Sequence, residues 1–437
     1  MINISQNEFS KRRNQLSKYI DNGILILPGN KSFVRNHDVN YDFRQNSDFW
    51  YLSGFNEPNS ILIILFKPEI EYIMFVEPYD VHHHIWEGYR AGIEGAKNTF
   101  KANKSYPISE IQNILPEIMS EYDDIYYRIG SDDIVDEIIT SFYSTQLRQV
   151  TGKRGNYNIN SNLNHGSVSI IDPIPFISNL RMIKSENEIK LIDEAINITS
   201  KGFNHIHSIL DTSMTEYDVQ VEIEYLFRKN GSRYNAYPSI VAGGKNACVL
   251  HYIDNNQNLN KADFLLIDAG AEFEYYASDI TRTYKVSKDI HSLKLEAYNI
   301  VLDAQQNAIK SVRPGKTLKD IHKTALDILI DGLKDLKFLD ASYQDIIENN
   351  LYSEYYMHGT SHWLGLDVHD SSPYTINKAD VILEPGMIFT VEPGLYFSSR
   401  SSFTTHNKNL EGTGIRIEDN ILVTKDGYRN MSDQIKY

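Results

Sequence analysis

The chain has 437 residues, enough for two domains that each bury a core of their own. Hydrophobic residues make up 41% of the chain and charged residues 23%, a balance that excludes a largely disordered protein. The formal net charge of −15 argues against nucleic acid as a partner, because neutralising phosphates requires a basic face.

Cysteine content and apolar runs indicate the compartment. Cys248 is the one cysteine, so no disulfide can form within the chain, and a large protein with a single thiol is typical of a reducing environment. The N-terminal residues carry charges and amides where a signal peptide would carry an apolar core. The longest aliphatic and aromatic run, 61–66, is too short to cross a bilayer. We therefore expect a cytoplasmic protein with no membrane partner.

Short apolar segments alternate with helical stretches in the first part of the chain. Segments rich in branched and aromatic side chains predict buried strands at 23–28, 60–66 and 71–76. Such alternation indicates an α/β domain whose sheet is covered by helices. Pro173 and Pro175 interrupt both helix and strand, so we predict domains at 1–172 and 173–437.

One local helical pattern occurs twice in the second part of the chain. Ser185 and Glu188 form a capping box, in which side chains satisfy backbone amides at a helix start, and an apolar stripe follows. A second helix is predicted from Thr215 to about Gly231. The order helix, turn, Thr-x-x-Asp, helix returns at 292–320, which indicates an internal duplication unless these common capping boxes recur by chance.

Two aspartates lie in or at the end of predicted strands. Asp268 follows the apolar residues 264–267, and Asp279 lies eleven residues further on in an alternating segment. Neighbouring strands would turn both acids toward one site. Burying a carboxylate is costly unless it is paired or bound to metal. The alternatives are an Asp268 that faces solvent and an Asp279 that pairs with Arg282.

Three more potential metal ligands lie in later segments. His362 belongs to a glycine-broken, histidine-rich stretch, and Glu392 ends an apolar strand before Pro-Gly. Glu418 lies in an alternating segment, where pairing with Arg416 is the alternative. Glu384 also precedes Pro-Gly, so the local sequence does not choose between it and Glu392. Four carboxylates and one imidazole suit ions such as Mn²⁺ or Co²⁺, and bridging carboxylates hold two ions ~3.5–4 Å apart.

These motifs in this order resemble the pita-bread metallopeptidase family, and within it the Xaa-Pro aminopeptidases (aminopeptidase P). The resemblance covers nearly the whole chain and begins at 41–58, which is similar to a signature of the N-terminal domain in that family. It implies an α/β (α+β) protein, with an N-terminal creatinase-like α/β domain and a C-terminal pita-bread domain that has a curved antiparallel sheet. The two related halves of that fold would account for the duplicated helices.

The resemblance also implies the site. It implies two divalent ions per subunit, expected to be Mn²⁺, and these ligands: Asp268, Asp279, His362, Glu392 and Glu418. Asp279 and Glu418 would bridge both ions, and Glu392 would shuttle a proton. His251 and His369 match histidines that stabilise the tetrahedral intermediate.

Further matches surround this centre. His358 matches a residue of the proline pocket. Tyr237 and Tyr374 are expected at the substrate site, where they and Arg416 match positions that orient the ligands.

Two matches fall in the N-terminal domain. Trp86 matches a tryptophan that reaches the site of a neighbouring subunit in related tetramers, although a packing residue is the ordinary reading. Asp38 resembles an acid in a relay with the His369 equivalent, with a simple turn residue as the equal alternative.

The expected reaction releases the N-terminal residue from peptides with proline in the second position. A hydroxide shared by the two ions would attack the scissile carbonyl. The partners expected are such peptides and further copies of the chain, as a dimer or tetramer. The first rival is a prolidase, which cleaves only Xaa-Pro dipeptides. A metal-free creatinase-like enzyme and a non-catalytic module like those of histone chaperones are weaker rivals, because all five ligands are present.

Overall fold

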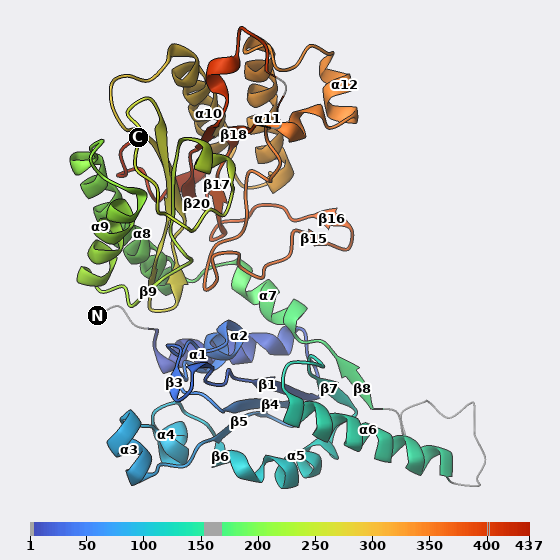
Figure 1. The fold of residues 1–437 in the computed structure, drawn as a ribbon. Coiled ribbons are helices and arrows are strands. Elements are labelled where there is room, and N and C mark those ends of the chain that lie inside the picture. Colours follow the sequence, from blue (N-terminus) through green and yellow to red (C-terminus); the bar gives the residue numbers. More distant parts are fainter. Residues whose placement is uncertain (1–3, 153–167, 400, 402) are drawn as a thin grey trace. The chain divides into compact units, whose positions relative to one another are not determined.

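The computed structural model describes residues 4–152, 168–399, 401 and 403–437 (Figure 1). The chain divides into two compact units, 4–180 and 181–437, and each is described separately. Within the described ranges, every helix is too short or too polar to span a lipid bilayer.

The N-terminal unit contains a mixed sheet with the strand order β6-β5-β4-β1-β7-β8. Its strands are β1 (Ile24–Pro28), β4 (Ile61–Phe66), β5 (Ile70–Val76), β6 (Lys104–Pro107), β7 (Asp124–Tyr126) and β8 (Ser169–Ile171). The hairpin β2 (Val34–Asn36) and β3 (Val39–Asn40) lies outside it. β1, β4 and β5 pair antiparallel, whereas β6, β7 and β8 join in parallel. The three strands predicted from apolar segments are thus confirmed as β1, β4 and β5.

Helices cover both faces of this sheet (Figure 1). The helices between residues 4 and 182 are α1 (Gln6–Gln15), α2 (Ser47–Ser53), α3 (Val81–Glu87), α4 (Gly92–Asn98), α5 (Ile111–Met119), α6 (Asp133–Gly152) and α7 (Ile174–Met182). α5 and α6 bury residues such as Leu115 and Ile139 against Ile63 and Phe75. On the other face, the Arg13 guanidinium of α1 lies 3.9 Å from the ring of Tyr72.

The C-terminal unit is built from small antiparallel sheets. The strands of its first half are β9 (Tyr234–Asn235), β10 (Ile240–Gly243), β11 (Phe264–Ala269), β12 (Ala271–Phe273), β13 (Tyr276–Ala277) and β14 (Ile280–Lys285). Those of the second half are β15 (Thr375–Ile376), β16 (Ala379–Asp380), β17 (Ile388–Val391), β18 (Gly394–Phe397), β19 (Thr413–Arg416), β20 (Asp419–Val423) and β21 (Tyr428–Asn430). β11 and β14 of the first half contact β19 of the second, so strands distant in sequence meet.

Each half carries its own helix pair. The helices are α8 (Glu186–Ile209), α9 (Glu216–Lys229), α10 (Ser292–Ser311), α11 (Leu318–Asp335) and α12 (Tyr343–Glu348). α8 and α9 bury their apolar stripes against β10, β11 and β14, while α10 and α11 do so against β17, β18 and β19. The predicted capping boxes at Ser185, Thr215 and Thr317 all form. This repeated packing is what the internal duplication predicted.

Candidate metal centre and active site

The C-terminal unit contains a cavity of about 550 Å³ where the two halves meet. Side chains from both halves line it, and every ligand predicted from the sequence is among them: Asp268, Asp279, His362, Glu392 and Glu418. Glu384, which the local sequence could not separate from Glu392, is instead exposed. The five ligand candidates therefore converge, although up to 150 residues separate them in the chain.

Asp268 lies near the end of β11, next to Thr281 of β14 in the strand register. Its Oδ2 accepts a 2.6 Å hydrogen bond from Nη2 of Arg416, and its Oδ1 accepts one from the hydroxyl of Tyr237. Gly270 explains the Asp-Ala-Gly motif, because a Cβ there would lie 1.8 Å from the backbone oxygen of Ser278. A glycine thus lets the end of β11 approach the segment that carries the second aspartate.

Asp279 lies in a break between β13 and β14. The sequence predicts Asp279 within an alternating strand, whereas the structure places it in the two-residue gap between two strands. The side chain of Asn420 replaces the missing ladder partner: it accepts a 3.1 Å hydrogen bond from the amide of Asp279 and donates a 2.6 Å one to its carbonyl. The Tyr237 hydroxyl lies within hydrogen-bonding distance of the Asp279 carboxylate as well as that of Asp268, and its single proton is donated to one of the two at a time. The backbone and side chain of Asp279 are therefore both fixed.

Glu418 lies between β19 and β20 and is 1% exposed. Its amide donates to the Thr281 carbonyl at 3.0 Å, and its Oε2 accepts a 2.7 Å hydrogen bond from the Thr281 hydroxyl. Its other oxygen, Oε1, is buried and has no hydrogen-bond partner among the described residues. A buried carboxylate oxygen without a partner is costly unless a cation accepts it as a ligand.

His362 and Glu392 come from adjoining backbone segments. The amide of Thr390 in β17 donates to the His362 carbonyl at 2.9 Å, and the Glu392 amide donates to the Thr360 carbonyl at 2.8 Å. Nδ1 of His362 lies 3.1 Å from the Trp363 carbonyl. An N–H there turns Nε2 toward Asp279 Oδ2 at 3.2 Å and Glu392 Oε1 at 3.4 Å.

Burial and mutual repulsion dominate the electrostatics of these acids. Burial, with the charges of Asp279 and Asp268, raises the pKa of Glu392 to about 7. Burial and the neighbouring carboxylates likewise hold the pKa of Glu418 well above its ordinary value. Burial opposes the charged form of His362, but the hydrogen bond to Asp279 and the charge of Glu392 raise its pKa to about 9. The cluster therefore favours positive charge at its centre.

Divalent ions fit this donor set. Asp279, His362 and Glu418 each offer a ligand atom, and these atoms lie within 4.8 Å of one another. Asp268 and Glu392 add carboxylates to the lining of the same cavity. Oxygen and imidazole donors without a thiolate suit borderline or hard ions. The unpartnered Oε1 of Glu418 is the observation that most directly calls for a cation.

The predicted catalytic histidines also line the cavity. His251 and His369 are exposed, and the His369 ring lies 4.3 Å from that of His362, centroid to centroid. His358 is half-buried, with Nε2 2.8 Å from the Tyr396 hydroxyl. Burial, together with the charge of Arg416, lowers the pKa of His358 to about 4, so it stays neutral near pH 7.

Three predicted site residues lie elsewhere. Tyr374 is half-exposed, packs its ring 6.0 Å from that of Trp363, and is not among the residues that line the cavity. Trp86, in α3 of the N-terminal unit, is 86% exposed. Asp38 is exposed in the turn between β2 and β3. Their expected roles remain predictions.

The sequence analysis does not identify the residues that position the ligand candidates through hydrogen bonds and ion pairs. The proposed alternative pairs do not form: Arg282 pairs with Asp419, and Arg416 pairs with Asp268. The sequence analysis also does not identify Thr281 and Asn420 as residues that support the ligand candidates. One signal could have identified Asp419. It follows Glu418 directly in an otherwise alternating segment, so the two acids point to opposite faces of the strand, and both faces are buried.

Comparisons with known proteins agree with this geometry. Residues 190–425 match the model of metallopeptidase family M24, and residues 9–126 match that of the aminopeptidase P N-terminal domain. The chain is 38% identical to a Xaa-Pro aminopeptidase of Haemophilus influenzae, over 98% of this chain and 94% of that protein. It is 34% identical to a Xaa-Pro aminopeptidase of Escherichia coli, over 100% and 96% of the two chains.

Solved structures show the same relationship. Aminopeptidase PepP of Pseudomonas aeruginosa superposes with a TM-score of 0.91 at 32% identity, over 100% of this chain and 96% of that one. This likeness confirms the predicted fold, an N-terminal α/β domain followed by a pita-bread domain. The N-terminal domain favours aminopeptidase P over prolidase. The chain therefore belongs to the aminopeptidase P group of metallopeptidase family M24, whose members are metal-dependent hydrolases.

Proposed function

We propose that the protein releases the N-terminal residue from peptides whose second residue is proline, with the cavity of the C-terminal unit as its active site. The observation that carries this proposal is the convergence of five ligand-type side chains on one cavity, together with the unpartnered buried Oε1 of Glu418. The named activity of the Haemophilus influenzae and Escherichia coli relatives supports the Xaa-Pro specificity.

We assign metal binding to the five side chains predicted from the sequence: Asp268, Asp279, His362, Glu392 and Glu418. Two divalent ions bound there, which we propose to be Mn²⁺, would lower the pKa of a water molecule and polarise the scissile carbonyl. Tyr237 and Arg416 keep the ligands in place through their hydrogen bonds to Asp268.

Glu392 is the proposed proton shuttle. Its carboxylate lines the cavity, with Oε1 3.4 Å from Nε2 of His362, where it can accept a proton from a water molecule and return it. The proton would come from the attacking water and go to the departing proline nitrogen. Proton transfer of this kind typically contributes ~10²–10⁴-fold to a rate.

Histidines and apolar side chains complete the substrate site. The imidazoles of His251 and His369 line the cavity, where an N–H from each would donate to the oxygen that gains negative charge during attack. His358, fixed by Tyr396, would border the proline ring. Apolar residues that also line the cavity suit that ring and the first side chain: Ile240, Leu250, Ile253 and Val368.

A peptide panel tests the reaction. The purified protein is treated with a chelator, dialysed, and assayed with Mn²⁺, Co²⁺, Zn²⁺ or Mg²⁺ on a Xaa-Pro-Yaa tripeptide, a Xaa-Pro dipeptide and a Xaa-Ala-Yaa tripeptide. We expect loss of activity on chelation, best recovery with Mn²⁺, and release of the first residue from Xaa-Pro-Yaa alone. Cleavage of the dipeptide alone would indicate a prolidase, and equal cleavage of Xaa-Ala-Yaa would refute the proline specificity.

Assembly and compartment also remain proposals. We propose a homo-oligomer, dimer or tetramer, in which Trp86 of one copy reaches the cavity of another; its 86% exposure leaves it available for such a contact. We propose a cytoplasmic location from the single cysteine. Sedimentation of wild type and Trp86→Ala, with KM measured for both, tests the contact.

A further inference from the structure

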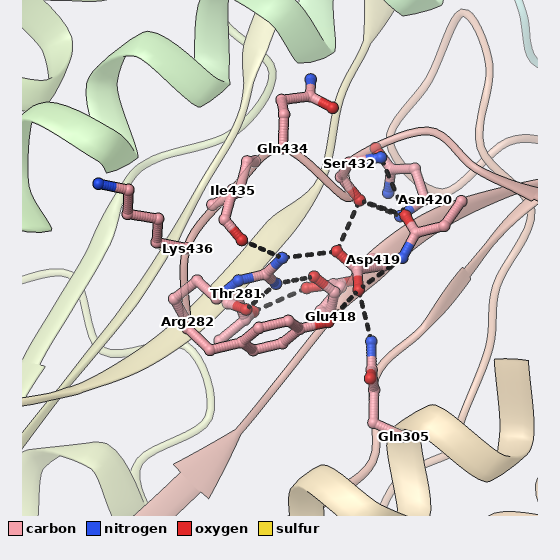
Figure 2. A network of polar contacts seen from close by, with 12 residues as sticks. Thr281, Arg282, Gln305, Glu418, Asp419, Asn420, Ser432, Gln434, Ile435 and Lys436 are labelled. Carbon is pink, nitrogen blue, oxygen red and sulfur yellow. Dashed lines mark hydrogen bonds and ion pairs between the residues drawn. The ribbon is translucent and has the colours of Figure 1, made fainter.

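A buried ion pair lies next to the metal centre without lining the cavity. Arg282 in β14 and Asp419 at the start of β20 are 1% and 0% exposed, and Nη2 of the arginine lies 2.7 Å from Oδ1 of the aspartate. Figure 2 shows this pair within a network of polar contacts. Two buried charges require nearly complete hydrogen bonding, so the partners of each show what the pair holds in place.

The carboxylate of Asp419 is saturated with donors. Besides Arg282, it accepts hydrogen bonds of 2.6–3.0 Å from Gln305, Asn430, Ser432 and Tyr437. Gln305 belongs to α10, and the other three belong to the last segment of the sequence. A carboxylate with five donors has no free lone pair for a cation, so Asp419 is a support and not a ligand. Its fixed position in turn fixes the start of β20.

The guanidinium of Arg282 holds the backbone on either side of the site. Its Nη1 donates to the carbonyl of Glu418 at 2.6 Å and to that of Thr281 at 3.0 Å. One cationic group thus joins the metal-ligand residue Glu418 to the strand β14. Nη2 also reaches the Ile435 carbonyl at 3.3 Å (Figure 2). The planar fork of arginine can make all these contacts at once, which a lysine cannot.

The residue that follows Asp419 holds the other acid proposed to bridge the ions. Asn420 bonds both the amide and the carbonyl of Asp279, as described above. Three consecutive residues therefore have different roles. Glu418 lines the cavity, Asp419 fixes the segment through its hydrogen bonds, and Asn420 bonds the backbone of Asp279. A shift of the anchor would move both bridging acids together.

We propose that Arg282 and Asp419 are positioning residues that set the spacing of the Asp279 and Glu418 carboxylates and thereby the affinity of the centre for a pair of divalent ions. This inference rests on the proposed metal site. Hydrogen bonds behind metal ligands typically change metal affinity by ~10–100-fold. The Arg282–Asp419 pair does not bond the ligand side chains directly. It fixes the backbone that carries Asp279 and Glu418, and therefore affects both ions.

Binding of Mn²⁺ to the chelated full-length protein, measured by calorimetry, tests the proposal. Arg282→Lys keeps the charge and removes the fork, and Asp419→Asn keeps the shape and removes the charge. We expect each variant to bind Mn²⁺ about 10–100-fold more weakly than wild type. We also expect excess Mn²⁺ to restore most of kcat on a Xaa-Pro-Yaa peptide with KM for the peptide unchanged. A loss of kcat that excess Mn²⁺ does not restore would overturn the proposal.

A matched control separates position from general stability. Asp263→Asn removes a part-buried ion pair with Lys294 in the same unit, outside the network, and we expect it to leave Mn²⁺ affinity unchanged. Tyr437→Phe deletes one hydrogen bond at the edge of the network and keeps the test decisive if both core variants fail to fold. We expect it to weaken Mn²⁺ binding severalfold, and wild-type affinity in every folded variant would overturn the proposal.

The wild-type titration distinguishes two failures. If wild type itself bound no pair of ions, the proposed metal site would be wrong. If wild type bound two ions and the folded variants bound them equally well, only the positioning role would be wrong. Circular dichroism and thermal unfolding of each variant identify those that fold.

Discussion

Thr281 and Glu418 are joined twice. The Glu418 amide donates to the Thr281 carbonyl at 3.0 Å, and the Thr281 hydroxyl donates to Glu418 Oε2 at 2.7 Å. The hydroxyl oxygen also lies 3.2 Å from Nε of Arg416, which can donate to it. The Thr281 side chain thus orients the Glu418 carboxylate, which is proposed to bind metal. It also accepts a hydrogen bond from Arg416, the residue that pairs with Asp268.

Thr281→Val tests this relationship, because it keeps the shape and removes the hydroxyl. Glu418 Oε2 would lose its donor and gain rotational freedom, so we expect Mn²⁺ affinity to fall about 10-fold or more. Thr283→Val is the matched control: in the part of the chain that the structure describes, the Thr283 hydroxyl bonds only the backbone of Arg416. The variant should cost about 2 kcal/mol of unfolding free energy, about 1 kcal/mol for each hydrogen bond lost, and leave Mn²⁺ affinity as it is. Equal affinity losses in the two variants, measured by calorimetry, would contradict the assigned role.

Asp279→Asn should abolish binding of the ion pair. The amide keeps the volume and the contact with Tyr237 but removes the negative charge between His362 and the other acids. Activity should fall by more than ~100-fold, the upper end of the loss expected when a residue that hydrogen-bonds a metal ligand is substituted. Metal content after dialysis, measured by elemental analysis, checks the prediction. A variant that retained two ions and full activity would show that Asp279 is not a ligand.

His251→Ala should separate catalysis from metal binding. His251 lines the cavity, and no contact joins it to a ligand side chain among the described residues. We expect two bound Mn²⁺ ions and a kcat lowered by ~10²–10³-fold, the effect of losing one donor to a developing negative charge. His205→Ala, which removes a surface histidine paired with Glu222, is the control and should change neither value. Loss of metal in the His251 variant would assign it to the metal centre instead.

The sequence predicts those features that depend on local chemistry. Capping boxes formed where Ser185, Thr215 and Thr317 stand, because each needs only residues three positions apart. Likewise, Asp268 lies near the end of a buried strand, as its apolar neighbours indicate. The convergence of the five ligand candidates could be expected only from the resemblance of their motifs to a family, since periodicity carries no information on which distant strands meet.

The features that the sequence analysis predicts wrongly or omits depend on contacts between residues far apart in the chain. Asp279 interrupts its strand because Asn420, 141 residues away, supplies the hydrogen bonds that a neighbouring strand would otherwise make. Arg282 pairs with Asp419, 137 residues away, although an acid three positions before it offered a nearer partner. Local charge spacing fails here because Arg282 and Asp419 are both buried where β14 and β20 are in contact, and the contact between these strands is not encoded in neighbouring residues.

The acidic cluster should make the chelated protein less stable as the pH rises. Burial and the charges of Asp279 and Asp268 raise the pKa of Glu392 from 4.5 to about 7, while His362 and Arg416 oppose this increase. A group with a raised pKa in the folded state binds more protons there than in the unfolded chain. Its contribution to stability is therefore complete below about pH 4.5 and is lost as the pH rises through 7.

Divalent metal should reverse this trend. Ions bind the deprotonated carboxylates, so metal binding releases protons from Glu392 and Glu418 and strengthens as the pH rises. We expect the melting temperature of the chelated protein to fall between pH 5.5 and 8, and the increase on adding Mn²⁺ to be larger at pH 8. Glu392→Gln cannot titrate at this position, so the fall should be smaller in that variant. A wild-type melting temperature that rose with pH after chelation would mean that these acids are already ionised at pH 5.5.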